Sequence, residues 1–172
     1  NNVRHGVDIR ELSRHVMESL RDEIGETINL TVREGDEVIY VERATPNRMM
    51  RVEQVIGSRA PLHVTAVGKL MLAELGNTFI RAYSERTGLK PYTKHTLSHQ
   101  EDLIKAIHES TLQGFAYDNE EAEIGVGCIG VLIPDSSGNV VAGLSISAPI
   151  ERRKNEWAKL LKDSARKISE QL

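Results

Sequence analysis

The chain has almost no cysteine: Cys128 is the only one among its 172 residues. An internal disulfide is therefore impossible, and a lone thiol fits a reducing compartment such as the cytoplasm. Long apolar runs are also missing, since none approaches the roughly 20 residues that span a bilayer. The first residues do not have the pattern of a signal peptide. We therefore expect a cytoplasmic protein with no membrane partner.

An excess of positive charge is missing as well. The chain carries 22 Lys and Arg residues against 25 Asp and Glu residues, a net charge of −3, and its sequence pI is about 6.1. A free-standing nucleic-acid-binding protein usually has a basic face and a high pI, so this composition argues against one. The shares of apolar (40%) and charged (27%) residues are ordinary for a globular protein. The length suits one domain with its own core.

The spacings that mark metal and cofactor sites are absent too. The six histidines are scattered along the chain, and no group of cysteines accompanies them, so we predict no metal site. The segment Val67-Gly68-Lys69 lacks the rest of a phosphate-binding P-loop. We therefore expect that the protein uses no cofactor.

What the chain does contain is an ordered series of helix and strand patterns, without internal repeats. Apolar residues at helical spacing predict helices, alternation predicts strands, and Ser98 with Glu101 matches a capping box. This order, α-βββ-ααα-βββ-α, predicts an α+β domain: an antiparallel sheet of about six strands flanked by helices. The predicted helices cover about 7–24, 65–75, 77–87, 99–113 and a last segment with Trp157 and Ile168, and the predicted strands cover about 28–32, 38–41, 49–55, 115–118, 126–133 and 140–147.

The start of the second predicted helix is the first candidate for a binding site. Thr65 suits the N-cap position, and the N–H groups of Ala66, Val67 and Gly68 would then lack acceptors within the helix. Such a helix start attracts carboxylate or phosphate oxygens. The alternative is a cap satisfied by Thr65 and water alone. Lys69 in the same turn is not counted as a ligand contact, because its side chain can point to solvent.

The last two predicted strands supply the second candidate. If they pair directly outward from their turn, an antiparallel ladder places Cys128 opposite Ser145 and Val126 opposite Ser147. Buried hydroxyls without partners cost roughly 1–3 kcal/mol each, so a bound ligand would fill the space above these small residues and satisfy them. The alternative is a helix packed closely over this face, with the serine hydroxyls bonded to backbone. The same face carries Gly130 and Gly143, while Ile129, Val131, Ile133, Leu144 and Ile146 point to the opposite one.

An acidic residue, Asp118, follows the apolar-looking segment 115–117. It can accept a hydrogen bond from a ligand hydroxyl, or it can cap the turn that follows, whose acidic run 120–123 reads as a solvated face. With Cys128 and His63, Asp118 could also form a nucleophilic site. However, Cys128 lies in the middle of a predicted strand, where a thiol is usually inert. We therefore expect a binding protein and not an enzyme.

Several motifs occur together in the order and spacing of one protein family. Over essentially all 172 residues, the chain resembles the C-terminal effector-binding domain of the IclR family of bacterial transcription regulators. The resemblance implies a GAF-like α/β domain, with residues 1–172 forming the effector-binding domain. The motifs are Gly6-Val7-Asp8-Ile9, Arg59-Ala60-Pro61-Leu62-His63 followed by Thr65-Ala66-Val67-Gly68-Lys69, Gly114-Phe115-Ala116-Tyr117-Asp118-Asn119-Glu120-Glu121, Gly125-Val126-Gly127-Cys128-Ile129-Gly130-Val131 and Leu144-Ser145-Ile146-Ser147-Ala148-Pro149.

The resemblance also implies partners. In this family DNA binds to an N-terminal winged helix-turn-helix domain of roughly 75 residues. This chain does not contain that domain, so we expect DNA contact only through it. Family members act as homodimers or homotetramers, and small metabolites, often organic acids, alter their promoter binding. Repression is the commoner mode, so the resemblance favours a repressor with a small organic acid effector.

Residue roles are carried over from the resemblance by position. Family members with a small keto-acid effector have Gly-Ala where this chain has Ala66-Val67, and Ala60 and Val126 here replace larger apolar groups, so we expect an effector of another shape than glyoxylate or pyruvate. The alternatives are a small enzyme that uses Cys128 and a dimerisation module without a ligand. The implied effector-binding residues are Ala66, Val67, Asp118, Cys128, Ser145 and Ser147, and the implied apolar wall is Met49, Val52, Ala60 and Val126.

Overall fold

The computed structural model describes the backbone of residues 2–172 and the side chains from Ile9 onward. The side chains of the Gly6-Val7-Asp8 motif therefore lie outside the described residues. None of the described helices is both long enough and apolar enough to cross a membrane. The elements are α1 (Asn2–Ile24), β1 (Thr27–Glu34), β2 (Glu37–Ala44), β3 (Arg59–Pro61), η1 (Leu62–Val64), α2 (Ala66–Leu75), α3 (Asn77–Thr87), α4 (Gln100–Gln113), β4 (Ala116–Asn119), β5 (Val126–Pro134), β6 (Val140–Pro149), η2 (Ile150–Arg152) and α5 (Trp157–Ser169).

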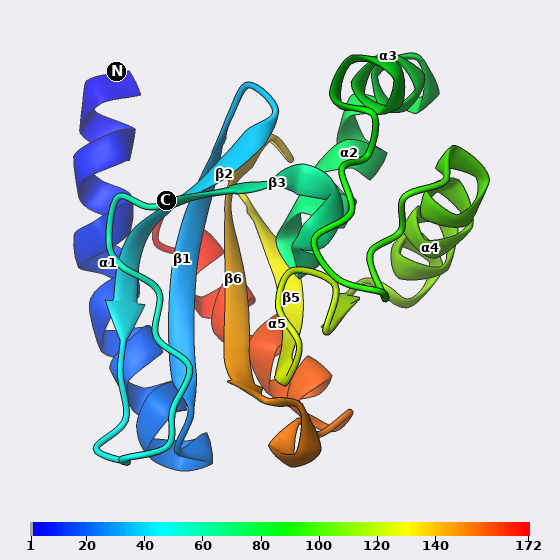
Figure 1. Ribbon diagram of the computed structural model, residues 1–172. Coiled ribbons are helices and arrows are strands. Elements are labelled where there is room, and N and C mark those ends of the chain that lie inside the picture. The colour runs from blue at the N-terminus through cyan, green and yellow to red at the C-terminus, as the bar shows by residue number, and fades with distance from the viewer. Residues whose placement is uncertain (1) are drawn as a thin grey trace.

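One six-stranded sheet organises the chain, with the strand order β3-β2-β1-β6-β5-β4. Every neighbouring pair in it is antiparallel. Helices α1 and α5 pack together on one face, while α2 lies on the other face with α3 and α4 beside it (Figure 1). The predicted element order and the predicted antiparallel sheet of six strands flanked by helices are both confirmed.

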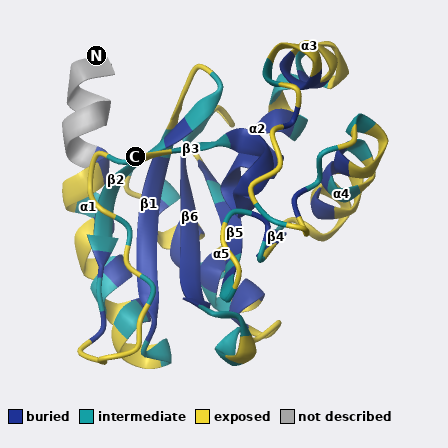
Figure 2. Ribbon diagram, viewed as in Figure 1, coloured by how far each residue is buried: buried dark blue, intermediate teal, exposed yellow. Residues whose placement is uncertain are grey.

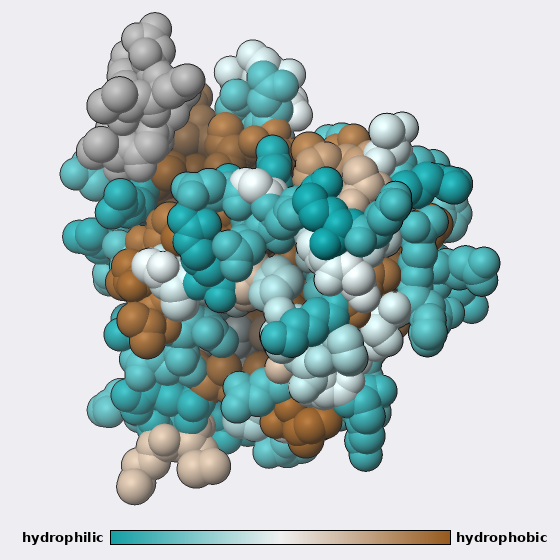
Figure 3. All heavy atoms as spheres, turned by 45° about the horizontal axis from the view of Figure 1, so that its top comes forward, coloured by the Kyte–Doolittle hydropathy of each residue, from teal (hydrophilic) through white to brown (hydrophobic). Residues whose placement is uncertain are grey.

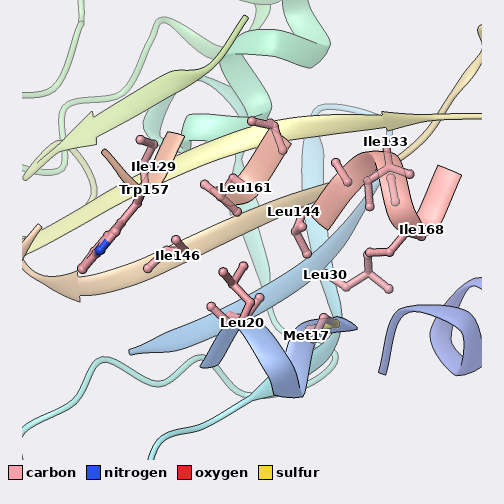
Figure 4. Packing of buried hydrophobic residues seen from close by; sticks show 14 of the residues in the cluster. Met17, Leu20, Leu30, Ile129, Ile133, Leu144, Ile146, Trp157, Leu161 and Ile168 are labelled. Atoms are coloured by element: carbon pink, nitrogen blue, oxygen red, sulfur yellow. The ribbon is translucent and has the colours of Figure 1, made fainter. Parts of the chain in front are cut away.

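The hydrophobic core fills the space between the sheet and the pair α1 and α5. The residues that alternation assigned to this face are fully or almost fully buried, and β1 and β6 are dark along most of their length in Figure 2. Figure 4 shows the strand side chains pointing at the helices. The labelled members are Met17, Leu20, Leu30, Ile129, Ile133, Leu144, Ile146, Trp157, Leu161 and Ile168.

The predicted strand at 49–55 is wrong. Residues 45–58 form a long loop, and the third strand is β3. The carbonyl groups of this loop accept hydrogen bonds from side chains instead of from a neighbouring strand: Thr27 donates to Val52, and Arg43 donates to Gln54. Hydrogen bonds from side chains thus take the place of a backbone ladder between strands. The apolar residues of the loop, which suggested a strand, do not pack into a sheet.

The predicted cap of α4 is also wrong, since the N-cap residue is His99 and no side chain caps the helix. The hairpin of β5 and β6 differs from the assumed register by two residues: Cys128 pairs with Ser147, and Gly130 pairs with Ser145. An irregularity between Ile133 and Pro134 displaces the ladder next to the turn. A slip of two residues keeps each side chain on its face, so the predicted division into two faces is retained.

Candidate functional site

The start of α2 presents unpaired backbone donors, as the sequence predicted. Thr65 is extended, with φ −120° and ψ 148°, and its Oγ1 accepts the N–H of Gly68 at 3.1 Å. Among the described residues, the N–H groups of Ala66 and Val67 have no acceptor. Because the first N–H groups of a helix have no partner within it, two donors remain for another molecule.

The same helix start lies directly on the sheet, because two glycines leave room for it. A Cβ atom at Gly130 would be 2.8 Å from Val67 Cγ1, and one at Gly143 would be 2.7 Å from it. Any residue larger than glycine would push α2 away. Close helix packing, the alternative to a ligand, therefore holds for the glycine part of this face, and it occupies the side chain of Val67.

Beyond the glycines, the face is not covered by the helix and a cavity of about 150 Å³ remains. Its lining residues come from β2, β3, α2, β4, β5 and β6 and from the loops 45–58 and 120–125. Seven residues predicted for the site line it: Ala60, Ala66, Val67, Asp118, Val126, Cys128 and Ser145. Five lining residues were not predicted, namely Tyr40, Gln54, Thr65, Ala122 and Glu123.

Three predicted residues do not line this cavity. Ser147 is 1% exposed and lies beneath it, 3.3 Å from Cys128 Sγ. Met49 is 98% exposed in the loop 45–58, and Val52 is held through its carbonyl group by Thr27. The structure therefore places Met49 and Val52 in a loop that contributes only Gln54 to the wall.

A buried asparagine supports the two serines from β1. Asn29 is 0% exposed and faces Ser145 across the β1–β6 ladder. Its Nδ2 donates to Ser147 Oγ at 2.9 Å and to Ser145 Oγ at 3.4 Å, while its Oδ1 has no partner among the described residues. In sequence, Asn29 is one of the polar residues that alternate with Ile28 and Leu30, a pattern that suggests solvent on its face.

Asp118 caps the turn that follows it, one of the two predicted alternatives, and it also lines the cavity. It is 3% exposed, it lines the cavity, and its Oδ1 accepts the N–H of Glu121 at 2.8 Å. Burial raises the pKa of the Asp118 carboxyl group to about 6, and the nearby charge of Glu121 adds to this effect. The hydrogen bond from Glu121 and the charge of Lys69 act in the opposite direction. The carboxyl group therefore titrates close to neutral pH.

A buried ion pair lies next to Asp118, and the sequence did not reveal it. Lys69 Nζ is 2.6 Å from Glu121 Oε1 and donates to the carbonyl oxygen of Tyr117, also at 2.6 Å. The side chains of Lys69 and Glu121 are only 4% and 3% exposed. Lys69 therefore does not point to solvent. The prediction of a solvated face over residues 120–123 is wrong for Glu121, which is buried. Of the four residues in that run, Glu123 alone is exposed.

The geometry does not provide Cys128 with a histidine. Burial, followed by the charge of Asp118, raises the pKa of the Cys128 thiol, and its side-chain partner is Ser147. The ring of His63 instead bonds Tyr83 Oη at 2.7 Å and the carbonyl oxygen of Lys90 at 3.0 Å. A protonated thiol without a histidine is a poor nucleophile. Among the described residues no His, Cys, Asp and Glu group could hold a metal ion.

The lining of the cavity thus combines the backbone donors of Ala66 and Val67 with a carboxyl, a thiol and a hydroxyl group. The relatives of the chain are regulators. HTH-type transcriptional repressor AllR of Escherichia coli is 33% identical over 169 residues, which are 96% of this chain and 62% of AllR. HTH-type transcriptional regulator KdgR of Dickeya chrysanthemi is 36% identical over 151 residues, 86% of this chain and 50% of KdgR. The chain therefore spans less than two thirds of either relative.

Solved structures and a family model agree with these relatives. The crystal structure of transcriptional regulator YaiJ is 30% identical, with a TM-score of 0.90 over 96% of both chains. The family model for the bacterial transcriptional regulator IclR C-terminal region matches residues 1–170. The chain therefore belongs to the IclR family of bacterial transcriptional regulators, as a C-terminal domain of that family.

Proposed function

We propose that the cavity binds a small organic acid and that this acid is the effector of the regulator. The observation that carries the proposal is the cavity itself: the free N–H groups of Ala66 and Val67 share it with Asp118 and Ser145. Helix N-termini favour carboxylate oxygens through their N–H groups and their dipole. The acid's carboxylate would bind there, and a keto or hydroxyl oxygen would face Asp118 and Ser145.

The volume supports a compact acid. A cavity of about 150 Å³ has room for a molecule of roughly benzene's size. The side chain of Val67 lies against Gly130 and Gly143, so it takes little of the space that a ligand needs. An effector shaped differently from glyoxylate or pyruvate stays a prediction, and nothing in the volume calls for a much larger one.

The full-length protein would use this domain as its sensor. We propose a homodimer or homotetramer whose N-terminal winged helix-turn-helix domains bind promoter DNA in the bacterial cytoplasm. An acid that binds one quaternary arrangement more tightly shifts the population toward it and changes promoter binding. Repression is supported by AllR, which is a repressor.

Thermal unfolding with a panel of acids tests the proposal. The panel comprises glycolate, glyoxylate, lactate, pyruvate, 2-oxobutyrate and their four- to six-carbon hydroxy and keto homologues. A ligand at 100 times its Kd stabilises the folded state by about 2.7 kcal/mol, which raises Tm by roughly 5–10 °C for a chain of this size. The proposal is refuted if no acid of the panel raises Tm.

Variants then locate the binding site. Ser145→Ala removes a hydroxyl that lines the cavity, and we expect it to weaken the best acid about tenfold or more. Ser136→Ala is the matched control, because Ser136 is exposed in the turn between β5 and β6. If the domain is a dimerisation module without a ligand, adding acid would leave the Tm of each variant unchanged.

A further inference from the structure

The charges around the cavity are poorly suited to an anion. Of the described residues that line it, Asp118 and Glu123 are acidic, and none is Lys, Arg or His. Lys69 is near but is already paired with Glu121 at 2.6 Å. Arg153 donates to the main-chain oxygen of Asp118 at 2.9 Å and is not among the lining residues. Among the described residues that line the cavity, the positive end of α2 is thus the one cationic feature.

An ionised acid in this cavity would lie beside the ionised Asp118. Two carboxylates that share a buried site disfavour each other's charge, so one of them takes up a proton. Asp118 is the better place for the proton, because burial already favours the neutral form of its carboxyl group. Its neighbours are Glu121 on the following loop, Lys69 on α2, the thiol of Cys128 on β5 and the phenol of Tyr40 on β2. The thiol and the phenol stay neutral because burial raises the pKa of each.

We propose that the cavity takes its acid together with one proton, so that Asp118 becomes a neutral carboxylic acid and donates a hydrogen bond to the bound acid. This inference rests on the proposed function and deepens it. The N–H of Glu121 already occupies Asp118 Oδ1 at 2.8 Å, which leaves Oδ2 to carry the proton. The proton comes from solvent, and no covalent bond changes.

The proposal fixes the sign of the pH dependence. The Asp118 carboxyl group of the empty domain has a pKa of about 6, and a bound anion raises it further. Below about pH 6 the group is already protonated, so the affinity is level. Above that value binding takes up one proton, and the affinity falls by up to about tenfold for each pH unit.

Calorimetric titration measures the proton directly. The probe is the acid of the panel above that raises Tm most, titrated at about pH 7.5 in two buffers, phosphate and Tris, that differ in ionisation enthalpy. The difference between the two observed enthalpies gives the protons taken up, and we expect about one. No uptake, with an affinity that does not change between about pH 6 and pH 8, overturns the proposal.

Two variants separate Asp118 from the rest of the site. Asp118→Asn keeps the shape and a donor but cannot titrate, so binding at about pH 7.5 should be at least as tight as in the parent chain, with no proton uptake. Glu109→Gln removes one charge from the exposed face of α4, away from the cavity, and uptake should stay near one. A tenfold loss in Asp118→Asn would show that the carboxylate acts as an acceptor and would overturn the proposal. Failure of every acid to bind the parent chain refutes the proposed function instead.

Discussion

Helix α2 packs on the sheet through a close contact that can be tested by adding one methyl group to a glycine. In Gly143→Ala the new Cβ would lie 2.7 Å from Val67 Cγ1, 2.8 Å from Val67 Cβ and 2.9 Å from Thr31 Oγ1. Carbon atoms in good contact are about 3.5–4.0 Å apart, so something must move by nearly 1 Å. Overpacking costs typically about 1–3 kcal/mol, and the loss of glycine's backbone freedom returns roughly 0.5–1 kcal/mol. We expect a net loss of about 1–2 kcal/mol.

A second substitution distinguishes steric conflict from other causes. Val67→Ala removes the methyl groups that Gly143 accommodates, and alone it should cost about 1.6 kcal/mol for two buried carbons plus a cavity contribution. In the double variant the contact with Val67 Cγ1 is relieved, while the contacts with the Cβ atom of residue 67 and with Thr31 Oγ1 remain. The double variant should therefore be more stable than the sum of the two single effects by about 1 kcal/mol.

Urea denaturation of the four proteins gives these free energies. The matched control is Gly127→Ala in β5, where the new Cβ meets Ile150 Cδ1 and not Val67. Gly127→Ala and Val67→Ala should add within about 0.5 kcal/mol. Additive effects for Gly143→Ala and Val67→Ala as well would refute the packing of α2 on the glycines.

Three further substitutions probe the polar groups. Asp118→Asn should stabilise the ligand-free domain above about pH 6 by up to roughly 3 kcal/mol, and not near pH 4. The reason is that the folded-state pKa is raised from 3.8 to about 6, so the stability contributed by the protonated form is lost as the pH rises through 6; Tm against pH measures it. Glu26→Gln should cost about 2 kcal/mol in urea, because Glu26 is 1% exposed and accepts two bonds from Arg152 at 2.7 and 2.9 Å; an unchanged midpoint would contradict this. Asn29→Leu should change stability by less than about 1 kcal/mol, because the lost hydrogen bonds are offset by removal of an unpaired buried Oδ1, and chemical denaturation with an m-value comparison would detect a larger effect.

The elements and their faces were predictable because hydrophobic periodicity and the residues that begin or end helices are local features of the sequence. Thr65 caps α2, and α4 ends at Gln113, as the sequence indicated. The wrong strand at 49–55 fails for a non-local reason. Its carbonyl groups accept hydrogen bonds from side chains of β1, β2 and the segment after β6; for example, Arg152 donates to the carbonyl oxygen of Met50. A local sequence pattern cannot predict which distant side chain will donate a hydrogen bond to these carbonyl groups.

The site was predictable in its small and polar members, and its charges were not. Cys128 and Ser145 stand out because small residues interrupt an apolar strand. Lys69 and Glu121 look like ordinary surface residues in sequence, 52 positions apart, and only the fold shows that they are buried 2.6 Å from each other. Charge burial depends on three-dimensional neighbours, so periodicity alone cannot reveal it.

Unmet polar groups gather at one place in this fold, and their gathering supports a site independently of the family. A single buried group without a partner proves little, since Ser13 Oγ on α1 is one and Ser13 does not line this cavity. Around the cavity, however, the free N–H groups of Ala66 and Val67, the unpaired Oδ1 of Asn29 and the raised pKa of Asp118 occur together. Each of these features lowers the stability of the empty domain. Local rules of folding are broken where function requires it, so the sheet face that was least favourable for folding is the one that a ligand would complete.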